Sequence, residues 1–267
     1  FDSVYGVLTI LKAIRELLQL FVYAYLVDNS RAPSGTRSFD IVYQFTRQSV
    51  LKLFEMGCQL VILGCNTASA KALLSIQQND LPKIDPQRRV LGVIRPTAEI
   101  VGKLTQTKHI GILATPGTTK SNSYNIEINK LWPELNVTGV ACPLWVPIVE
   151  NNEATGAGAD YFVKKRIDHI LWLDPDIDTL ILGCTHYPLI SKNLKRLYPN
   201  IKIFSSSKEV ATAVKMELEA ADMLSQNENA KSIFYASDLS ENFGNMIERI
   251  LGRDSDELNI KFKNLDI

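Results

Sequence analysis

The sequence predicts an α/β protein of two similar three-layer domains with mostly parallel sheets. A pseudo-twofold axis would relate the domains, with an active site in the cleft between them. Two observations carry this expectation. Short apolar runs alternate with amphipathic stretches of ten or more residues, which is the pattern of βαβ units. An apolar strand ending in Gly-Cys also occurs twice, at residues 60–67 and 180–186, about one domain length apart.

The periodicity of apolar residues predicts the elements in order. Apolar positions at 8–18 recur at helical spacing, Ser38 is a suitable N-cap, and Pro96 can open a helix at its first turn. We therefore expect helices at 8–18, 38–56, 67–77, from Pro96, and at 118–131, 161–173 and 206–224. We expect strands at 21–27, 60–63, 90–94, 110–113, 180–182 and 201–204. The stretch from Ser232 onward is ambiguous.

Two local signals indicate the domain boundaries. A turn is expected at residues 94–96, and a run of serines at 205–207 precedes the helix expected at 206–224. The first domain should therefore contain residues 1–94 and 206–267, and the second should contain residues 95–205. The chain would then return from the second domain to pack its last long helix on the first.

Composition excludes several classes of protein. The chain has 267 residues, 46% of them apolar, with 29 basic and 29 acidic residues. This is ordinary for a globular protein and unlike disordered, collagenous or coiled-coil sequences. Charges of both signs are evenly spread, so we expect no nucleic-acid partner. The strongest apolar run, at 20–27, is far shorter than the roughly 20 residues that span a bilayer, so no membrane association is expected either.

Cysteine and histidine spacing predicts neither disulfides nor a metal site. The four cysteines, at 58, 65, 142 and 184, contain no CxxC pattern, which favours reduced thiols in the cytoplasm. His109, His169 and His186 share no ligand spacing, so no metal is expected. We expect Cys58, Cys142, His109 and His169 to take no part in chemistry.

The duplicated Gly-Cys motif indicates a pair of reactive thiols. A cysteine just past the carboxyl end of a parallel strand lies at the N-terminus of the next helix, where the helix dipole favours a thiolate. Asn66, Thr67 and Thr185 follow the two cysteines and supply donors suited to carboxylates. Each cysteine alone could be an ordinary buried thiol. The two copies together favour a functional interpretation.

Two opposed thiols suit inversion of a stereocentre. One thiolate would remove a proton from one face of a carbon, and the other thiol would deliver a proton to the opposite face. Two alternatives remain open from the residues alone. A redox dithiol is one, although such pairs usually lie in CxxC. A Cys–His hydrolase with His186 as the base is the other.

Six segments of the chain match the pattern of one known family. These segments are Phe-Asp-Ser at 1–3, DNSRAPSGT at 28–36, GCNTAS at 64–69, GILATPGTTKSNSY at 111–124, CPLWVPIVE at 142–150 and LGCTHYPL at 182–189. In these segments the sequence resembles the glutamate racemases of the aspartate/glutamate racemase superfamily. The segments occur in order over at least three quarters of the chain, and the two cysteine motifs together are highly specific.

The resemblance implies roles for particular residues. Cys65 and Cys184 would be the two catalytic acid/bases, with Cys65 deprotonating the D-enantiomer and Cys184 the L-enantiomer. Asp2 and His186 would assist the thiols, with Glu150 close by. The positions expected to hold the substrate are Asp2, Ser3, Ser34, Gly35, Asn66, Thr67, Thr115, Thr185 and His186.

The resemblance also implies an activity and its setting. The expected activity is interconversion of L- and D-glutamate without a cofactor or metal. Its product would supply D-glutamate for peptidoglycan synthesis in the bacterial cytoplasm. We expect a homodimer with glutamate as its small-molecule partner.

Two departures from the family pattern leave alternatives open. Residues 4–7 read Val-Tyr-Gly-Val where the family has a glycine-rich turn, and Ser34 stands where the family usually has tyrosine. Valine and tyrosine reach positive φ poorly, so we expect the turn after Ser3 to be altered. A racemase for another acidic amino acid, such as aspartate, is one alternative. A racemase-like binding protein with weakened catalysis is the other.

Overall fold

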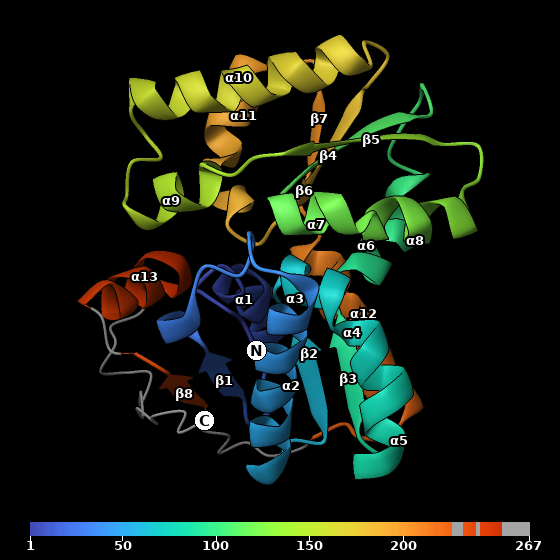
Figure 1. The fold of residues 1–267 in the computed structure, drawn as a ribbon, viewed down its shortest axis with the longest axis vertical. Helices are drawn as coiled ribbons and strands as arrows, with labels where there is room; N and C mark the ends of the chain where they lie inside the picture. The colour runs from blue at the N-terminus through green and yellow to red at the C-terminus, as the bar shows by residue number, and fades with distance from the viewer. Residues whose placement is uncertain (226–231, 239–240, 253–267) are drawn as a thin grey trace. The chain divides into compact units, whose positions relative to one another are not determined.

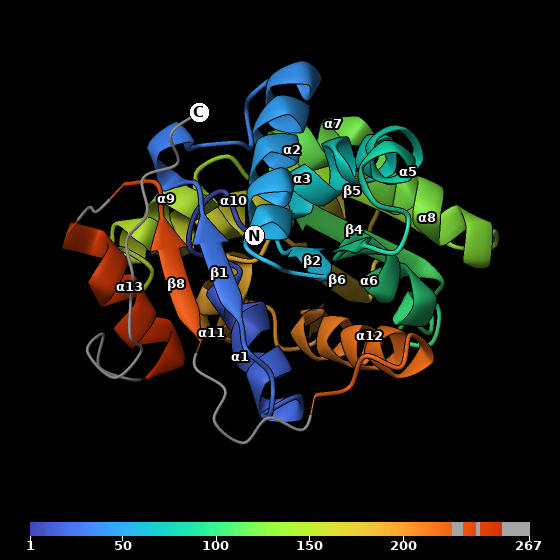
Figure 2. The ribbon, with the colours of Figure 1, turned by 90° about the horizontal axis from the view of Figure 1, so that it is seen from below.

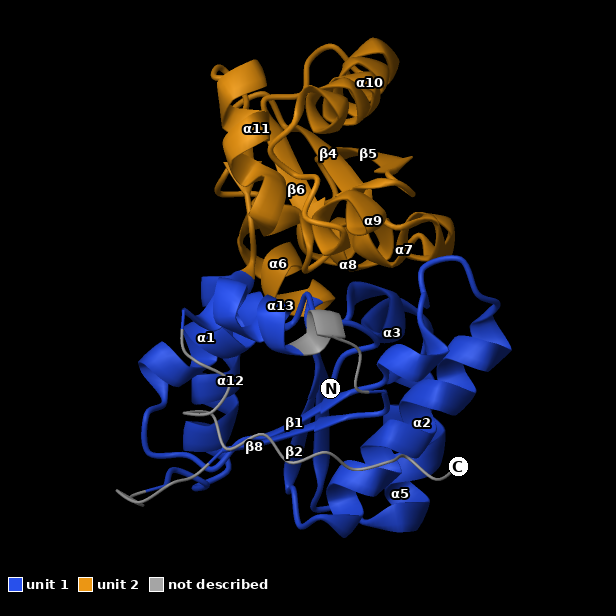
Figure 3. Ribbon diagram, turned by 90° about the vertical axis from the view of Figure 1, so that its left-hand side faces the viewer, with its two compact units in different colours: residues 1–93, 207–267 blue, residues 94–206 orange. Residues whose placement is uncertain are grey.

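Each of the two compact units of this computed structural model contains a parallel α/β arrangement. Residues 1–93 with 207–267 form unit 1, and residues 94–206 form unit 2 (Figure 3). Both boundaries lie one residue from those expected from the sequence. The structure describes residues 1–225, 232–238 and 241–252. The expected α/β class with parallel sheets is confirmed.

Two pairs of parallel strands form the core of unit 1. Strand β1 (Ala24–Val27) pairs with β8 (Ile233–Ala236), and β2 (Leu60–Leu63) pairs with β3 (Arg89–Gly92). Figure 2 shows α2 (Phe39–Glu55) on one side of these strands, and α1 (Leu8–Leu17) with α12 (Ser207–Ala220) on the other. The remaining elements of unit 1 are η1 (Asn29–Arg31), α3 (Asn66–Lys71), α4 (Leu73–Ser75), η2 (Ile76–Asp80), α5 (Leu81–Ile84) and α13 (Glu241–Leu251).

The first two residues of the chain connect the two strand pairs of unit 1. Asp2 forms a parallel bridge with Val27, because its N–H donates to the Leu26 carbonyl over 3.0 Å and its carbonyl accepts from the Asp28 N–H over 3.0 Å. On the other side, the Gly64 N–H donates to the Phe1 carbonyl over 2.9 Å. Residues 1–2 therefore lie between the carboxyl ends of β1 and β2.

Unit 2 contains a four-stranded parallel sheet in the order β5-β4-β6-β7. In Figure 1, α10 and α11 lie on one side of this sheet, and α6 and α8 lie on the other. The strands are β4 (His109–Ala114), β5 (Asn136–Ala141), β6 (Thr179–Gly183) and β7 (Lys202–Phe204). The helices are α6 (Ile94–Val101), α7 (Pro116–Ser121), α8 (Ser123–Leu131), α9 (Trp145–Glu150), α10 (Ala157–Leu173), η3 (Tyr187–Ile190) and α11 (Ser191–Leu197).

Two of the expected helices are interrupted. The helix expected at 67–77 ends at Lys71, and the chain continues through α4 and a π-helical turn to Asp80. Asp80 is buried there and accepts hydrogen bonds from Tyr43 Oη over 2.7 Å and Arg47 Nε over 2.8 Å. The helix expected at 118–131 breaks at Asn122, which adopts the left-handed conformation with φ 59°. Asparagine is among the few residues that enter this region readily.

Several other expectations need adjustment. The strand expected from residue 21 begins only at Ala24. Strand β5 was not expected, because its sequence contains asparagine and glycine, which disfavour strands. The ambiguous stretch from Ser232 contains β8 and α13, while the parts of it at 239–240 and 253–267 lie outside the described residues. None of the helices in the described part of the chain has the length and apolar character needed to cross a membrane.

The glycine before each cysteine is required by close packing. A Cβ atom built on Gly64 would lie 1.6 Å from Val7 Cγ2, and one on Gly183 would lie 3.1 Å from both Ala114 Cβ and the Leu113 carbonyl oxygen. Gly64 directly follows β2 and Gly183 is the last residue of β6, and both lie in crowded surroundings. The Gly-Cys repeat therefore has a structural cause as well as a chemical one.

We predict that Gly64→Ala destabilises unit 1. The added methyl group overlaps Val7, and overpacking of this kind costs about 1–3 kcal/mol of unfolding free energy. Urea denaturation followed by circular dichroism measures the loss. The double variant Val7→Ala/Gly64→Ala should recover part of it, because the clashing Cγ2 atom is removed.

The matched control is Gly158→Ala, where no atom lies within 4 Å of the added methyl group. This variant should be at least as stable as the original chain, since alanine is also the better helix former. Equal stability of all four proteins would show that Gly64 is not packed as described.

Candidate active site

In unit 1, the bridge made by residues 1–2 brings Ser3 to the first cysteine. Cys65 follows β2 and is the N-cap of α3, as the motif predicted. Ser3 follows the bridging pair, and its Oγ lies 3.3 Å from Cys65 Sγ. Both side chains are buried. Asn66 and Thr67 form the first turn of α3 and are buried beside them. The cysteine therefore has a hydroxyl partner supplied from 62 residues earlier in the chain.

The carboxylate of Asp2 organises the turn that follows it. One oxygen accepts from the Ser3 N–H over 2.7 Å, and the other accepts from the Val7 N–H over 2.8 Å, just before α1 begins. The residue itself is 1% exposed. Two backbone donors thus fix the orientation of Asp2 and shape the turn that places Ser3 beside Cys65.

The altered turn at 4–7 does not need positive φ. Val7 is helical, with φ −65°, and Val4 and Tyr5 are absent from the residues with left-handed φ in the described part of the chain. Val4, Tyr5 and Val7 are all buried, and Tyr5 Oη accepts a hydrogen bond from Asn29 Nδ2 over 3.1 Å. Valine and tyrosine therefore cause no left-handed backbone strain in this turn, although its sequence is altered as expected.

In unit 2, the second cysteine has charged neighbours. Cys184 follows β6, and its Sγ lies 3.8 Å from His186 Nδ1. The other ring nitrogen of His186, Nε2, lies 3.0 Å from Glu150 Oε1, which α9 supplies. Thr185, which separates Cys184 from His186 in the sequence, is also buried. Three of the residues expected to be catalytic thus form one connected row.

His186 is held in its protonated form. Burial alone would lower its pKa, but the hydrogen bonds and charges of Cys184 and Glu150 outweigh burial and raise the pKa to about 10. At neutral pH the imidazole is therefore a cation. It provides a counter-charge for a thiolate at Cys184, and Glu150 in turn balances the histidine.

One local expectation for Cys184 is wrong. It does not begin an α-helix, because the chain first makes the 3₁₀ turn η3 at Tyr187, and α11 starts only at Ser191. The Tyr187 ring packs edge-on against Trp145, and its hydroxyl donates to the Cys142 carbonyl over 3.0 Å. This buried contact ties the turn after Cys184 to the start of α9, which carries Glu150. Tyr187 is a supporting residue that sequence reasoning missed.

The other expected residues lie at the carboxyl ends of strands or in the loop after η1. Thr115 follows β4, is buried, and caps α7 by accepting from the Thr118 N–H over 3.3 Å. Thr118 is also buried beside it and was not among the expected residues. Ser34 and Gly35 are half-buried in the loop between η1 and α2.

The remaining cysteines have structural surroundings. All four cysteines are free thiols. Burial raises the pKa of Cys142 far above its ordinary value and also raises the pKa of Cys58. Neither thiol is therefore suited to act as a thiolate near neutral pH.

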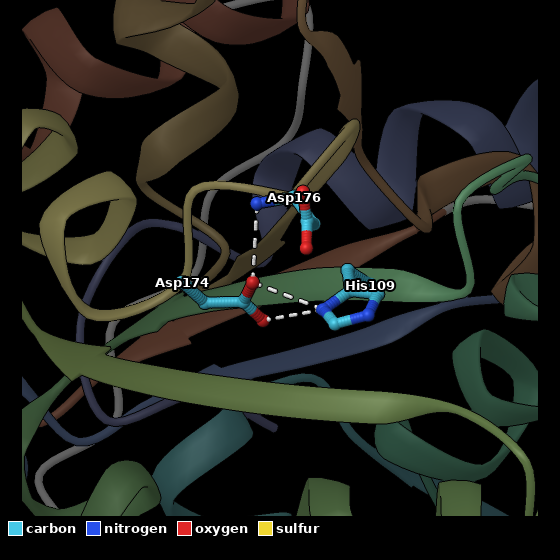
Figure 4. Close-up of side chains that lie close together, drawn as sticks. All are labelled: His109, Asp174 and Asp176. Atoms are coloured by element: carbon cyan, nitrogen blue, oxygen red, sulfur yellow. Dashed lines mark hydrogen bonds and ion pairs between the residues drawn. The ribbon is translucent and has the colours of Figure 1, made fainter.

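One cluster among the described residues offers side-chain atoms that could hold a metal ion. His109, Asp174 and Asp176 offer atoms within 4.8 Å of one another (Figure 4). His109 Nδ1 lies 2.9 Å from Asp174 Oδ1, and the Asp176 N–H donates to the same oxygen over 3.2 Å. These contacts join the start of β4 to the turn after α10. His109 thus has a structural contact with Asp174.

The fold and the two thiol sites define a racemase class. The model of the Asp/Glu/Hydantoin racemase family matches residues 5–214, and the chain belongs to this family. A glutamate racemase from Persephonella marina is 35% identical over 256 residues, covering 95% of this chain and 93% of the relative.

Solved structures agree with this assignment. The crystal structure of glutamate racemase from Francisella tularensis in complex with D-glutamate has a TM-score of 0.90 at 28% identity and covers 100% of this chain and 96% of its own. A glutamate racemase isoform from Bacillus anthracis gives a TM-score of 0.90 at 32% identity, with the same coverage.

We predict that Glu150→Gln lowers the pKa of His186 from about 10 toward its ordinary value of 6.5, because the charge on its Nε2 partner is removed. The raised pKa stabilises the folded state fully below pH 6.5, and this stabilisation is lost as the pH rises through about 10. NMR titration of the ¹⁵N-labelled imidazole measures the shift.

Glu153→Gln is the matched control, since this glutamate is exposed and lies three residues from Glu150, which is the carboxylate that contacts His186. It should leave the titration of His186 as it is in the original chain. If Glu150→Gln and Glu153→Gln give the same His186 titration, the Glu150–His186 pair does not set the charge of the ring.

Proposed function

We propose that this protein is a glutamate racemase that inverts the Cα centre with two thiols. The observation that carries the proposal is the pair of strand-Gly-Cys sites, one in each unit, each with its own polar partner. Membership of the family and the curated relatives named glutamate racemase support glutamate as the substrate. Racemisation of another acidic amino acid and a non-catalytic binding role are less well supported.

The reaction needs one thiolate and one thiol. For D-glutamate, the Cys65 thiolate takes the Cα proton, and the Cys184 thiol delivers a proton to the opposite face to give L-glutamate. After this turnover Cys65 is a thiol and Cys184 a thiolate, which is the state that accepts L-glutamate. No external oxidant or reductant is needed, and every proton lost from carbon is replaced.

The neighbours of each thiol have separate proposed roles. Ser3 would orient the Cys65 sulfur through its 3.3 Å contact, and Asp2 would hold Ser3 in place through the turn. The His186 cation would balance the Cys184 thiolate. The ammonium and carboxylate groups of the substrate are proposed to bind to the remaining expected residues, which are Ser34, Gly35, Asn66, Thr67, Thr115 and Thr185.

The two-thiol reaction also has requirements for its surroundings. Both the base and the acid are thiols of this chain, so the mechanism requires neither a metal nor an organic cofactor. We further propose that the protein works in the bacterial cytoplasm as a homodimer and supplies D-glutamate for peptidoglycan. Reduced thiols are an absolute requirement of the mechanism, which suits a reducing compartment.

We predict that Cys65→Ser and Cys184→Ser each reduce racemisation of glutamate at least about 1,000-fold, since a hydroxyl is a far weaker acid than a thiol. Each variant keeps one base. With N-hydroxyglutamate, which loses water after removal of a single proton, Cys184→Ser should still eliminate from the D-substrate and Cys65→Ser from the L-substrate. Circular dichroism follows racemisation, and keto-acid formation follows elimination.

Cys58→Ser is the matched control and should racemise at the original rate, because its thiol has no proposed role. Wild-type rates in both single variants would contradict the two-thiol mechanism. Binding of glutamate by an inert wild-type protein would instead support the binding-protein alternative.

A further inference from the structure

We propose that Arg31 is a positioning residue that fixes the loop at 32–38, which contains Ser34 and Gly35, in the form that binds substrate. This inference rests on the proposed function, because that function assigns Ser34 and Gly35 to substrate binding. The loop joins η1 to α2. It is largely exposed and so has little buried surface of its own to order it.

Arg31 contacts both segments that the loop connects. On the side of β1, its Nε and its terminal nitrogen Nη2 lie 2.6 and 2.5 Å from Asp28 Oδ2. On the side of α2, its Nη1 donates to Gln48 Oε1 over 2.6 Å, and its guanidinium carbon lies 4.0 Å from the centroid of the Phe45 ring. A single planar group thus links the end of β1 to α2.

The surroundings of Arg31 make this link strong. The Arg31 side chain is 16% exposed and the Asp28 side chain 3%. Buried charge-assisted hydrogen bonds are stronger than those at the surface, and a stacked guanidinium adds a cation–π contribution. Asp28 also forms part of the parallel bridge, because its N–H donates to the Asp2 carbonyl. The link therefore reaches the turn that positions Ser3.

A second contact holds the far end of the loop. The Lys71 ammonium, at the end of α3, donates to the Arg37 carbonyl over 2.5 Å, and the Arg37 N–H donates to the Ser34 carbonyl over 3.2 Å. The helix α3 is the one that Cys65 caps. With Arg31 at its start and Lys71 near its end, the loop is tied to the elements that carry the first half of the proposed site.

Lysine cannot replace arginine in this role. An ammonium group keeps the charge for Asp28, but it cannot place donors on Asp28 and Gln48 together while lying flat on Phe45. Arg31→Lys should therefore loosen the loop without leaving a buried carboxylate unpaired. Gln48→Met provides a second variant, because it removes one acceptor and retains the charges and the size of the side chain.

Arg88 provides a matched control of the same construction. It pairs with Asp85, three residues earlier, and its guanidinium carbon lies 4.9 Å from the centroid of the Phe54 ring of α2. The turn at 85–88 precedes β3, whereas the loop at 32–38 follows β1, so the two clusters belong to opposite ends of parallel strands. Arg88→Lys disturbs unit 1 by similar chemistry without altering the loop.

The experiment measures kcat and KM for both glutamate enantiomers, together with hydrogen–deuterium exchange of the amides at 32–38. Arg31→Lys is expected to raise KM about tenfold, the equivalent of one charge-assisted hydrogen bond, and to change kcat less than about twofold. Exchange at 32–38 should become faster in Arg31→Lys and in Gln48→Met. Arg88→Lys should match the original chain in both measurements.

Two results would overturn the inference. One is unchanged KM and unchanged loop exchange in Arg31→Lys. The other is an equal change in Arg88→Lys, which would show a general loss of stability. Failure of the proposed function gives a different result, because the original chain itself would then not racemise glutamate, while loop exchange would still show whether Arg31 fixes the loop.

Discussion

Parallel strands end at the same edge of a sheet, and in both units the candidate residues occupy that edge. In unit 2, the candidate residues Thr115 and Cys184 directly follow β4 and β6, whose last residues, Ala114 and Gly183, lie opposite each other. In unit 1, Asp2 bridges to the end of β1, and Phe1 bonds to the residue after β2. The positions of Ser3 and Cys65 follow from this pairing. The turn after Asp2, the packing of Gly64 and the start of α3 at Cys65 all lie at this edge of unit 1.

The two thiols have different partners although their strands repeat the same sequence. Cys65 has a neutral hydroxyl at 3.3 Å, and the nearby Asp2 carboxylate is engaged by two backbone N–H groups. Cys184 has a cationic imidazole at 3.8 Å, balanced by Glu150. The repeated strand-Gly-Cys sequence thus places each cysteine at the end of a parallel strand, and residues outside the repeat give each thiol a different partner. A two-thiol racemase requires each thiol to exchange roles, but it does not require identical surroundings.

Much of this arrangement was predictable from the sequence. Periodicity located the main strands, and the duplicated Gly-Cys motif identified both thiols. The sequence pattern could not show that Gly64 lies against Val7, because that contact joins residues 57 positions apart in the chain. The role of Tyr187 was also hidden, since its partner Trp145 comes from another element. The π-helical turn at 76–80 ends at Asp80, which accepts hydrogen bonds from Tyr43 and Arg47. Both partners belong to another helix, so local helix propensity could not predict this turn.

The central claim is that two different groups exchange protons on the two faces of Cα. The most direct measurement follows the original chain with D-glutamate in D₂O by NMR and chiral separation at early times. A two-thiol mechanism predicts that newly formed L-glutamate carries deuterium at Cα while the remaining D-glutamate still carries protium. Equal early deuteration of both enantiomers would contradict the claim, because a single base would then serve both faces.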